Sequence, residues 1–364
     1  MRAAVLYEPC KPLLVEDIAL DEPGPGEIRV RMSAAGVCGT DLHAIEGQAR
    51  WPLPAVLGHE GAGVVDAVGP GTSSLAPGDH VVLASLVSCG RCTSCARGEP
   101  YLCQMGFGSL FGGTLMSGGR RLHKDGRALN HFFCQSSFAE YAVVDERIAV
   151  RVRPDAPPET VCLLGCGAMT GVGGVVNTAG VEPGASVAVF GCGGVGLSAI
   201  MGARLVGAGK IIAVDKLERK LAFAKELGAT HTVNVSHVEP VRAVHDITGN
   251  GADYAFEAIG SPVVMEQVFA AVRPGGKAVV LGAAAPGDVM RIDPFELIAG
   301  KALAGSTWGS GVPSVDIPRF VDLFMSGRLA LDRLVTRTYS LEQINDAFEA
   351  MKGGEVARAV IVFR

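Results

Sequence analysis

Apolar and polar positions follow different patterns in the two halves of this 364-residue chain. In the first half, β-rich runs at residues 28–32, 61–68 and 80–83 are separated by turn signals of Pro, Gly and Asp. Residues 138–144 form another candidate strand. Short strands joined by such turns are typical of antiparallel sheets, so we expect a mostly antiparallel, barrel-like domain here.

Beyond about residue 168, apolar runs of strand length alternate with helical segments. The expected strands cover residues 186–190, 211–214, 230–233, 253–256, 277–281 and 301–306. Helices are expected at residues 197–206 and 218–227, the second ended by Gly228. This alternation predicts an α/β fold with a doubly wound, six-stranded parallel sheet of the Rossmann type.

The hydrophobic pattern of the C-terminal tail differs from the strand–helix alternation before it and resembles that of the first half. Ser340 and Gln343 fit a capping box that begins a helix, and Gly353 ends that helix. Residues 357–363 form a final strand. We expect this strand to pair back with the first domain.

Composition excludes several classes of partner. Charged residues make up 19% of the chain and the net charge is -5, which argues against the basic patch that nucleic-acid binding needs. Two uncharged runs, residues 160–181 and 185–203, approach membrane-spanning length, but glycine clusters interrupt both. Buried parallel strands and their turns produce the same pattern, so no membrane span is expected. Ten cysteines without a secretory signal indicate a reducing, cytoplasmic location.

A long stretch between residues 104 and 137 carries glycine pairs and a basic cluster. We expect a loop region here, and loops of this length are functional or mobile. A solvated basic loop without a binding role fits the composition equally well.

Four closely spaced cysteines are the most specific feature of the first half. Cys89, Cys92, Cys95 and Cys103 form a C-x2-C-x2-C-x7-C cluster within a lobe at residues 88–104. Four thiolates suit a closed, structural zinc site. An iron-sulfur cluster is the rival, although the ferredoxin spacing places the fourth cysteine after three residues and before a proline. Disulfides are the remaining alternative.

A glycine-rich loop follows the strand at residues 186–190 and opens the next helix. Its G-x-G-x-x-G glycines are Gly191, Gly193, Gly194 and Gly196. In this context the glycines let the backbone approach a pyrophosphate at the helix N-terminus. Asp215 ends the next strand, where a carboxylate accepts hydrogen bonds from ribose hydroxyls and repels the 2′-phosphate of NADP. NAD is therefore the expected cofactor, although Lys216 and Arg219 could receive a phosphate.

Three further metal-binding side chains stand far apart in the sequence: Cys38, His59 and Cys166. Spacing alone does not decide their role, because each taken singly suits a buried structural residue. Together with the cysteine lobe and the glycine loop, their surroundings resemble the zinc-dependent alcohol dehydrogenases of the medium-chain dehydrogenase/reductase superfamily. The resemblance covers essentially the whole chain. Its motifs are Cys-Gly-Thr-Asp-Leu-His at 38–43, Gly-His-Glu-Gly-Ala-Gly-Val-Val at 58–65 and Gly-Cys-Gly at 165–167.

The resemblance implies a GroES-like catalytic domain and a dinucleotide-binding domain. The implied boundaries are residues 1–167 with 308–364 for the first, and residues 168–307 for the second. It also implies two zinc ions per chain and NAD as cofactors. The long 104–137 segment resembles that of the dimeric liver-type enzymes, so a homodimer is expected.

The resemblance also implies the catalytic metal ligands. Cys38, His59 and Cys166 would bind a zinc ion with one position left open. Glu60 would approach the metal from behind, and Asp41 would orient His59. Thr40 and His43 would carry the proton of a bound alcohol towards solvent. Zinc would act as a Lewis acid that lowers the pKa of the alcohol, and a hydride would pass to the nicotinamide.

Further cofactor contacts carry over by position. Lys220 would lie near the adenosine ribose, Arg358 at the pyrophosphate, Thr170 near the nicotinamide and Val195 behind its ring. Gly39 departs from the family, because many relatives place Arg or His there against the pyrophosphate. The loss of that charge should weaken NAD binding and speed its release.

Small residues at expected pocket positions also depart from the liver-type pattern. Ser85, Ala49 and Ala283 suggest a roomy pocket suited to bulky, aromatic or terpenoid-like primary or secondary alcohols. The run after Cys103 lacks the arginine that glutathione-dependent formaldehyde dehydrogenases use for their substrate, which makes a glutathione adduct a weaker candidate.

The expected activity is an NAD-dependent alcohol dehydrogenase acting on a small-molecule alcohol or aldehyde. One alternative is a reductase of an activated C=C bond, from the same superfamily. The other is a non-catalytic dinucleotide-binding protein whose zinc is only structural. The intact set of Cys38, His59, Cys166 and Thr40 argues against both alternatives.

Overall fold

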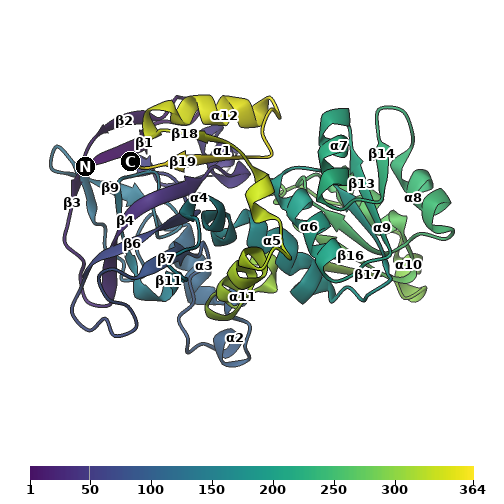
Figure 1. Ribbon diagram of the computed structural model, residues 1–364, viewed down its shortest axis with the longest axis horizontal. Coiled ribbons are helices and arrows are strands. Elements are labelled where there is room, and N and C mark those ends of the chain that lie inside the picture. The colour runs from purple at the N-terminus through teal and green to yellow at the C-terminus, as the bar shows by residue number, and fades with distance from the viewer. Residues whose placement is uncertain (49) are drawn as a thin grey trace. The chain divides into compact units, whose positions relative to one another are not determined.

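The computed structural model describes residues 1–48 and 50–364, and the chain folds into two compact units (Figure 1). Unit 1 comprises Met1–Cys166, Gly311–Ser326 and Leu334–Arg364. Unit 2 comprises Gly167–Ser310 and Gly327–Arg333.

Unit 1 contains two sheets in which most neighbouring strands run antiparallel. The first has the order β2 (Leu14–Asp17), β1 (Arg2–Leu6), β5 (Ala55–Val56), β9 (Arg127–His131), β8 (Leu122–Lys124), β3 (Ala19–Leu20). The second has the order β11 (Ala149–Arg151), β7 (His80–Leu83), β6 (Gly61–Val68), β4 (Glu27–Gly36), β19 (Arg358–Val362), β18 (Val335–Tyr339), with β10 (Tyr141–Asp145) also paired to β4. The antiparallel, barrel-like expectation for this part of the chain is confirmed.

Short helices connect these strands. They are α1 (Gly39–Ile45), α2 (Thr93–Ala96), η1 (Pro100–Leu102), α3 (Gln104–Leu110), η2 (Glu146–Ile148), α4 (Pro158–Val161), η3 (Cys162–Gly165), α11 (Pro313–Met325), η7 (Leu341–Gln343) and α12 (Ile344–Lys352). The capping box of Ser340 and Gln343 forms as expected, and α12 ends at Gly353. The final strand β19 pairs antiparallel with β4, which confirms that the tail returns to unit 1.

Unit 2 is built around a six-stranded sheet in which all neighbouring strands run parallel, as expected. Its order is β14 (His231–Asn234), β13 (Lys210–Asp215), β12 (Ser186–Phe190), β15 (Ala252–Glu257), β16 (Val272–Val280), β17 (Ala302–Gly305). The other elements are α5 (Gly167–Gly173), η4 (Gly174–Ala179), α6 (Gly194–Leu205), α7 (Glu218–Leu227), α8 (Pro240–Thr248), α9 (Pro262–Ala271), α10 (Pro294–Ile298), η5 (Trp308–Ser310) and η6 (Leu331–Leu334).

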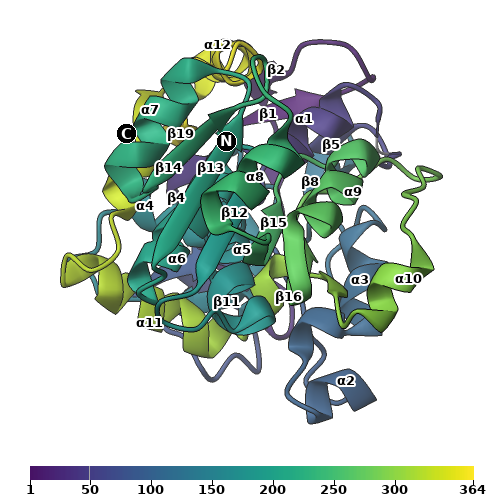
Figure 2. The same ribbon diagram turned by 90° about the vertical axis from the view of Figure 1, so that its right-hand side faces the viewer.

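Figure 2 shows the strands of unit 2 side by side, with helices on both faces of the sheet. One face is covered by α8 and α9, which pack on each other over apolar side chains such as Phe190, Val268 and Phe269. Helices α5, α6 and α7 pack together as a second group. This layered arrangement places the carboxyl ends of β12, β13 and β15 at one edge, where α/β sheets bind ligands.

Regular elements interrupt the expected loop between residues 104 and 137, so the expectation of a continuous loop region is wrong. It contains α3 and the antiparallel hairpin of β8 and β9. Helix α3 was not predicted because its sequence is rich in glycine, which is unfavourable in helices. The Cys103 side chain caps this helix by accepting a hydrogen bond from the Gly106 amide at 3.4 Å. The basic side chains of the hairpin lie next to acidic or polar partners. These pairs are Arg121–Glu27, His123–Asp21, Lys124–Glu16 and Arg120–Asn130.

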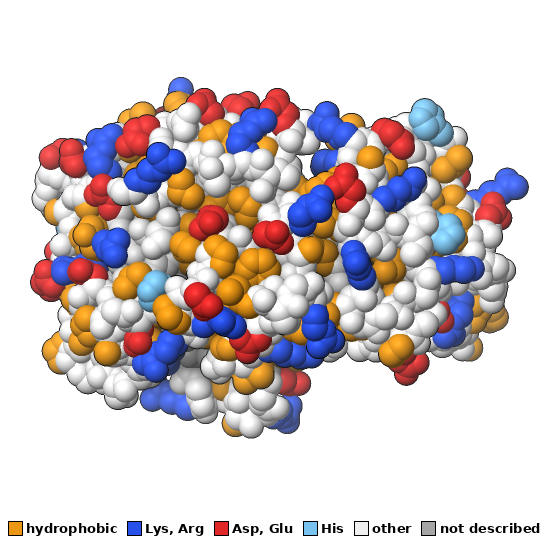
Figure 3. Space-filling model, in the orientation of Figure 1, with side chains coloured by type: hydrophobic (Ala, Val, Ile, Leu, Met, Phe, Trp, Pro, Cys, Tyr) orange, Lys and Arg blue, Asp and Glu red, His pale blue; other side chains and the backbone are white. Residues whose placement is uncertain are grey.

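Charged side chains of both signs are interspersed over the face of the molecule drawn in Figure 3. Within the described residues, no single helix is long and apolar enough to cross a membrane. Two helical segments joined at a bend, Pro158–Gly165 and Gly167–Ala179, are together long and apolar enough to do so by length and composition alone.

Candidate metal centres and dinucleotide site

The three distant metal-binding side chains of the sequence lie together in unit 1. One ligand atom from each of Cys38, His59, Glu60 and Cys166 falls within 4.8 Å of the others. Cys38 caps α1, His59 and Glu60 lie between β5 and β6, and Cys166 follows η3. The fold therefore brings to one point three segments that sequence spacing could not relate.

Asp41 ties two of these segments to each other. Its carboxylate accepts hydrogen bonds from the backbone amides of Cys38 at 3.3 Å and Gly58 at 3.0 Å. It also lies 3.1 Å from Nδ1 of His59, and both side chains are fully buried. A carboxylate on Nδ1 fixes the histidine tautomer and leaves Nε2 as the free ligand atom.

The donor set fits a zinc ion. Nε2 of His59 is buried and has no hydrogen-bond partner among the described residues, which is costly unless a metal or another ligand takes it up. A hydrogen bond from Cys166 lowers the pKa of the Cys38 thiol well below its usual value, and the charges of His59 and Arg358 act in the same direction against burial. Burial opposes the charged form of His59, but the charges of Asp41 and Cys38 raise its pKa well above the usual value. Zinc requires a thiolate and a neutral imidazole, so its binding would release the proton of His59.

Glu60 forms a buried ion pair with Arg358 on β19. Burial raises the pKa of Glu60 to about 6, although the Arg358 charge opposes the rise. A Cβ atom at Gly36 would lie 2.1 Å from a Glu60 carboxylate oxygen, so only glycine leaves room for this pair. The structure thus places Arg358, the expected pyrophosphate contact, beside the metal-binding cluster.

Thr40 and His43 both lie on α1, directly after the candidate ligand Cys38. Residues three apart on a helix share a face. The Thr40 hydroxyl oxygen lies 3.9 Å from Sγ of Cys38, and both Thr40 and His43 are half-buried. This arrangement places the Thr40 hydroxyl next to the candidate metal ligands and the His43 imidazole about one helical turn further along α1.

The expected pocket residues have different surroundings. Ser85 is buried, and its hydroxyl donates to the carbonyl of Gly165 at 2.9 Å, one residue before the ligand Cys166. Ala283 lies in unit 2, where its backbone packs against Gly260. Ala49 lies outside the described residues.

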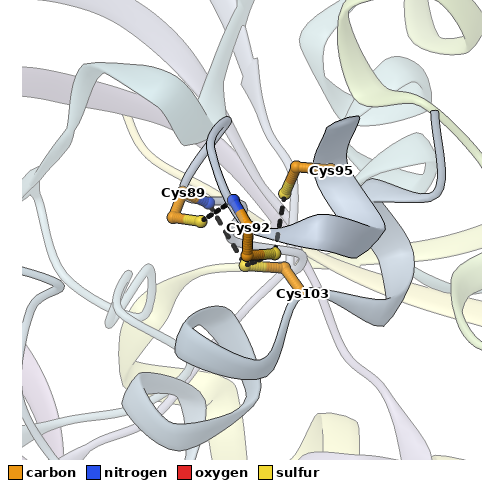
Figure 4. Close-up of side chains that lie close together, drawn as sticks. All are labelled: Cys89, Cys92, Cys95 and Cys103. Carbon is orange, nitrogen blue, oxygen red and sulfur yellow. Dashed lines mark hydrogen bonds between the residues drawn. The ribbon is translucent and has the colours of Figure 1, made fainter. Parts of the chain in front are cut away.

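The four cysteines of the lobe converge as the sequence predicts (Figure 4). Sγ of Cys92 lies 3.6 Å from that of Cys95 and 3.8 Å from that of Cys103. A tetrahedral site with Zn–S bonds of about 2.3 Å needs sulfur atoms roughly 3.8 Å apart. All ten cysteines of the chain are described, and none of them forms a disulfide. The geometry fits a closed metal site.

Backbone amides point at the lobe sulfurs. The amide of Cys89 donates to Cys103 Sγ, and that of Cys92 donates to Cys89 Sγ, both at 3.3 Å. Hydrogen bonds from the amides of Arg91 and Cys92 lower the pKa of Cys89 to about 6. Such bonds stabilise thiolates, the form that binds metal.

The glycine-rich loop of unit 2 joins β12 to α6. Gly191 has a φ of 96°, and Gly193 caps α6, which begins at Gly194. A Cβ atom at Gly196 would lie 1.7 Å from the carbonyl oxygen of Gly191. Glycine is therefore required for this close approach of helix and loop, and the helix N-terminus is left open to an anion.

Asp215 at the end of β13 supports this loop. Its carboxylate accepts from the amides of Cys192 at 2.8 Å and Leu217 at 3.0 Å. A cavity of about 560 Å³ lies beside it, lined by the expected residues Gly191, Gly193, Asp215 and Lys220.

Sequence reasoning missed other residues that line this cavity. They include Val235, Pro240, Ala258, Ile259 and Gln267. Most follow the carboxyl ends of β14 and β15, and their position after strands of the parallel sheet is the signal that could have found them. Of the other expected contacts, Val195 is half-buried at the start of α6, and Thr170 is buried in α5.

Comparison with known proteins places these features in context. Two family models match the chain: the alcohol dehydrogenase GroES-like domain over residues 24–155, and zinc-binding dehydrogenase over residues 194–326. A protein named alcohol dehydrogenase class-3, from Cereibacter sphaeroides, is 39% identical over 373 residues. That match covers 100% of this chain and 99% of the relative.

Solved structures give the same picture. An alcohol dehydrogenase zinc-binding domain protein from Burkholderia ambifaria superposes with a TM-score of 0.96 at 43% identity, covering 100% of this chain and 98% of that one. A benzyl alcohol dehydrogenase from Acinetobacter calcoaceticus superposes with a TM-score of 0.95 at 39% identity, covering 100% and 99%.

Proposed function

The chain belongs to the zinc-dependent alcohol dehydrogenases of the medium-chain dehydrogenase/reductase superfamily, and we propose that its own substrates are bulky, aromatic alcohols. It is an oxidoreductase that uses zinc and NAD(H) and acts on small-molecule alcohols and aldehydes. The relatives do not favour a C=C reductase or a non-catalytic dinucleotide-binding protein.

The observation that carries the zinc-dependent dehydrogenase activity is the cluster of Cys38, His59 and Cys166, in which Nε2 of His59 is buried and has no hydrogen-bond partner among the described residues. In the proposed enzyme these three residues hold the catalytic zinc. Glu60, which shares the cluster, is paired with Arg358. Three protein ligands would leave the ion able to bind a substrate oxygen.

A bound zinc ion supplies Lewis acidity that lowers the pKa of an alcohol, and the nicotinamide accepts the hydride. The protein provides the proton path. Thr40, beside Cys38, would accept a hydrogen bond from the alcohol hydroxyl and release its own hydroxyl proton as it takes up that of the alcohol. His43, on the same face of α1, would carry the released proton outwards. In the reverse direction the same two side chains return the proton.

The preference for NAD over NADP rests on Asp215. Both of its oxygens accept backbone amides, which fixes the position of the carboxylate in the lining of the cavity. A fixed negative charge there repels a 2′-phosphate and accepts ribose hydroxyls. Lys220 lines the same cavity.

A second, structural zinc completes the proposed cofactor set. The supporting observation is the sulfur spacing of Cys92, Cys95 and Cys103, together with the amides directed at Cys89 and Cys103. All four positions of this site are protein thiolates, so it has no place for a substrate.

We further propose that the protein is a homodimer, assembled through the β17 edge of the parallel sheet. Strand β17 is the last strand of its sheet, and Leu303 on it is exposed. Helix α10 beside it exposes Phe295 at 71% and Ile298 at 80%. An open strand edge flanked by apolar side chains is stable when it pairs with another chain.

The substrate proposal is supported by relatives and by the pocket residues. One matched structure is named a benzyl alcohol dehydrogenase, at 39% identity. Ser85 is small and keeps its hydroxyl turned to Gly165.

The deciding experiment is a substrate panel at neutral and alkaline pH with NAD and NADP, together with zinc counted per chain. We expect NADH formation from benzyl alcohol and other bulky alcohols, little with NADP, and two zinc ions per chain. Faster turnover of ethanol than of bulky alcohols would contradict the substrate class. A count of one zinc would contradict the two-site arrangement, and activity confined to a glutathione-formaldehyde adduct would redirect the assignment.

A further inference from the structure

The strand order of the parallel sheet reverses at one point, between β12 and β15 (Figure 2). From β12 the chain continues to β13 and β14 on one side, whereas β15, β16 and β17 extend the sheet on the other. Ligands of α/β sheets bind outside the carboxyl ends of the strands at such a point. Glu257 is the last residue of β15 and is fully buried there.

One oxygen of the Glu257 carboxylate closes the turn that follows β15. Oε1 accepts the amides of Ile259 at 2.8 Å, Gly260 at 2.6 Å and Ser261 at 3.3 Å. Successive amides that converge in this way form an anion-binding concavity, and here the chain's own carboxylate fills it. The φ of Gly260 is 90°, which glycine adopts without strain. The Glu257 side chain therefore determines the shape of residues 258–261.

The backbone of Glu257 holds the turn after β16. Its carbonyl oxygen accepts the amides of Leu281 at 2.8 Å and Gly282 at 3.2 Å. The two turns touch each other, since a Cβ atom at Gly282 would lie 2.2 Å from the Gly260 nitrogen, and one at Gly260 would lie 2.4 Å from the carbonyl oxygen of Ala283. One residue thus binds backbone amides of both loops at this edge of the sheet.

The turn after β15 also packs against the glycine-rich loop. The amide of Ala258 donates to the carbonyl of Phe190 at 2.9 Å. A Cβ atom at Gly191 would lie 2.5 Å from Cγ1 of Ile259, so the loop and the turn are in close contact. Ala258 and Ile259 both line the cavity of about 560 Å³ beside Asp215. The shape of this turn therefore sets one wall of the cavity.

The buried carboxylate of Glu257 costs stability. Its Oε2 atom has no hydrogen-bond partner among the described residues. Burial raises the pKa of Glu257, although the amides of the turn oppose the rise. Burying a charged group whose hydrogen bonds are incomplete is unfavourable, and such departures from a well-satisfied interior are frequent at functional sites.

We propose that Glu257 is a positioning residue for the dinucleotide, because it fixes the turn at Ala258 and Ile259 against the glycine-rich loop. The inference rests on the NAD(H) use of the proposed function. Glu257 acts through the amides that it holds rather than by touching the cofactor. Without the carboxylate those amides lose their acceptor, and the turn relaxes away from the glycine-rich loop. The wall of the cavity is then no longer preorganised, so the adenosine half of the cofactor binds more weakly.

Binding of ADP-ribose to the full chain tests this role without the oxidation step. ADP-ribose carries the adenosine and pyrophosphate of NAD but no nicotinamide. We expect Glu257→Ala to raise its Kd about ten- to thirtyfold in isothermal titration calorimetry. KM for NAD should rise by a similar factor, while kcat at saturating NAD should not fall. Glu257→Gln keeps an oxygen that can accept the three amides, so its Kd should stay within about threefold of wild type.

Asp253→Ala is the matched control, because Asp253 is a carboxylate near the opposite end of the same strand. It accepts the amide of Ser186 at 2.7 Å and the hydroxyl at 2.6 Å, and it pairs with Arg273. Its loss should lower the thermal midpoint and leave the Kd for ADP-ribose unchanged. The midpoints of all variants show whether a change in Kd follows stability or the turn.

An unchanged Kd in folded Glu257→Ala would overturn the proposal, and so would a Glu257→Gln protein that binds as weakly as Glu257→Ala. Equal weakening in Asp253→Ala would also overturn it, since that pattern indicates a general loss of sheet stability. If Glu257→Ala does not fold, Glu257→Asp decides: its shorter side chain withdraws the carboxylate from the turn, and the Kd should rise about threefold or more. A wild type that binds neither ADP-ribose nor NAD would instead overturn the cofactor assignment of the proposed function.

Discussion

Asp41 and His59 are fully buried partners, with the carboxylate 3.1 Å from Nδ1 of the imidazole. The same carboxylate holds the amides of Cys38 and Gly58, so one side chain sets both the tautomer of a ligand and the approach of two ligand segments. We expect Asp41→Asn to weaken zinc binding at this site roughly 10- to 100-fold. Dialysis against a graded chelator, with zinc counted per chain, measures the change. Asp17→Asn, at a largely exposed carboxylate, is the control.

Loss of either metal site should have a different consequence. Cys38→Ala is expected to abolish turnover and remove one zinc, while the thermal midpoint stays within a few degrees of wild type. Cys89→Ala is expected to lower the midpoint by several degrees or to impair assembly, because metal-binding energy at a closed site is folding energy. Cys10→Ala, at an exposed thiol, should change neither quantity. A Cys89→Ala protein of undiminished stability and zinc content would contradict the structural role.

The buried pair of Glu60 and Arg358 predicts a steep stability cost when only one partner is removed. Arg358→Met leaves an uncompensated carboxylate in the interior and should reduce the free energy of unfolding by about 3–5 kcal/mol. The double variant Glu60→Gln, Arg358→Met should recover part of this loss. KM for NAD separates the two roles of the arginine. If Arg358 also contacts the pyrophosphate, the double variant will regain stability and keep a raised KM.

Gly39 offers room for the charge that many relatives carry. It is exposed at the start of α1, and a Cβ atom built there meets no heavy atom within 4 Å. We expect Gly39→Arg to fold normally and to lower KM for NAD roughly three- to tenfold, since one added phosphate contact is worth about 1 kcal/mol or more. If cofactor release limits turnover, kcat should fall in parallel. Gly39→Gln supplies the matched uncharged side chain, and an equal effect from it would argue against a charge contact.

His131 should make the protein sensitive to mild acid. Burial lowers its pKa to about 3, and Nε2 accepts the Arg121 amide at 3.1 Å. Above about pH 6.5 the histidine is neutral in both the folded and the unfolded chain and contributes no pH dependence. As the pH falls below that value, only the unfolded chain takes up a proton, so stability is lost progressively down to about pH 3.

Between pH 7 and 5 this difference amounts to about 2 kcal/mol. His131→Gln keeps a neutral acceptor and should lose that much less stability over the interval than wild type does. Denaturant unfolding at both pH values measures the difference, with His123→Gln on the hairpin surface as the control. Parallel loss in wild type and His131→Gln would show that other groups govern the acid response.

Much of the fold could be predicted from the sequence, because its signals are local. Hydrophobic periodicity predicted the parallel sheet of unit 2, and helix α7 has the expected bounds. The glycine loop was recognisable because conformational demands at Gly191 and Gly196 admit few other residues. The cysteine lobe was recognisable because its four ligands lie within fifteen residues of one another. Glycine-rich α3 was missed, since its cap is a cysteine side chain.

Only the tertiary structure decided how segments that are distant in the sequence lie relative to one another within unit 1. The chain by itself determined which residue types are available: Cys38, His59 and Cys166 as ligands, and Asp41 as a possible partner. Folding decided that these ligands meet in one buried place, and that Arg358 lies against Glu60. Contacts of this kind leave no periodic pattern in the sequence, because they depend on how sheets and turns pack in space. Burial then influences the charge and orientation of each group.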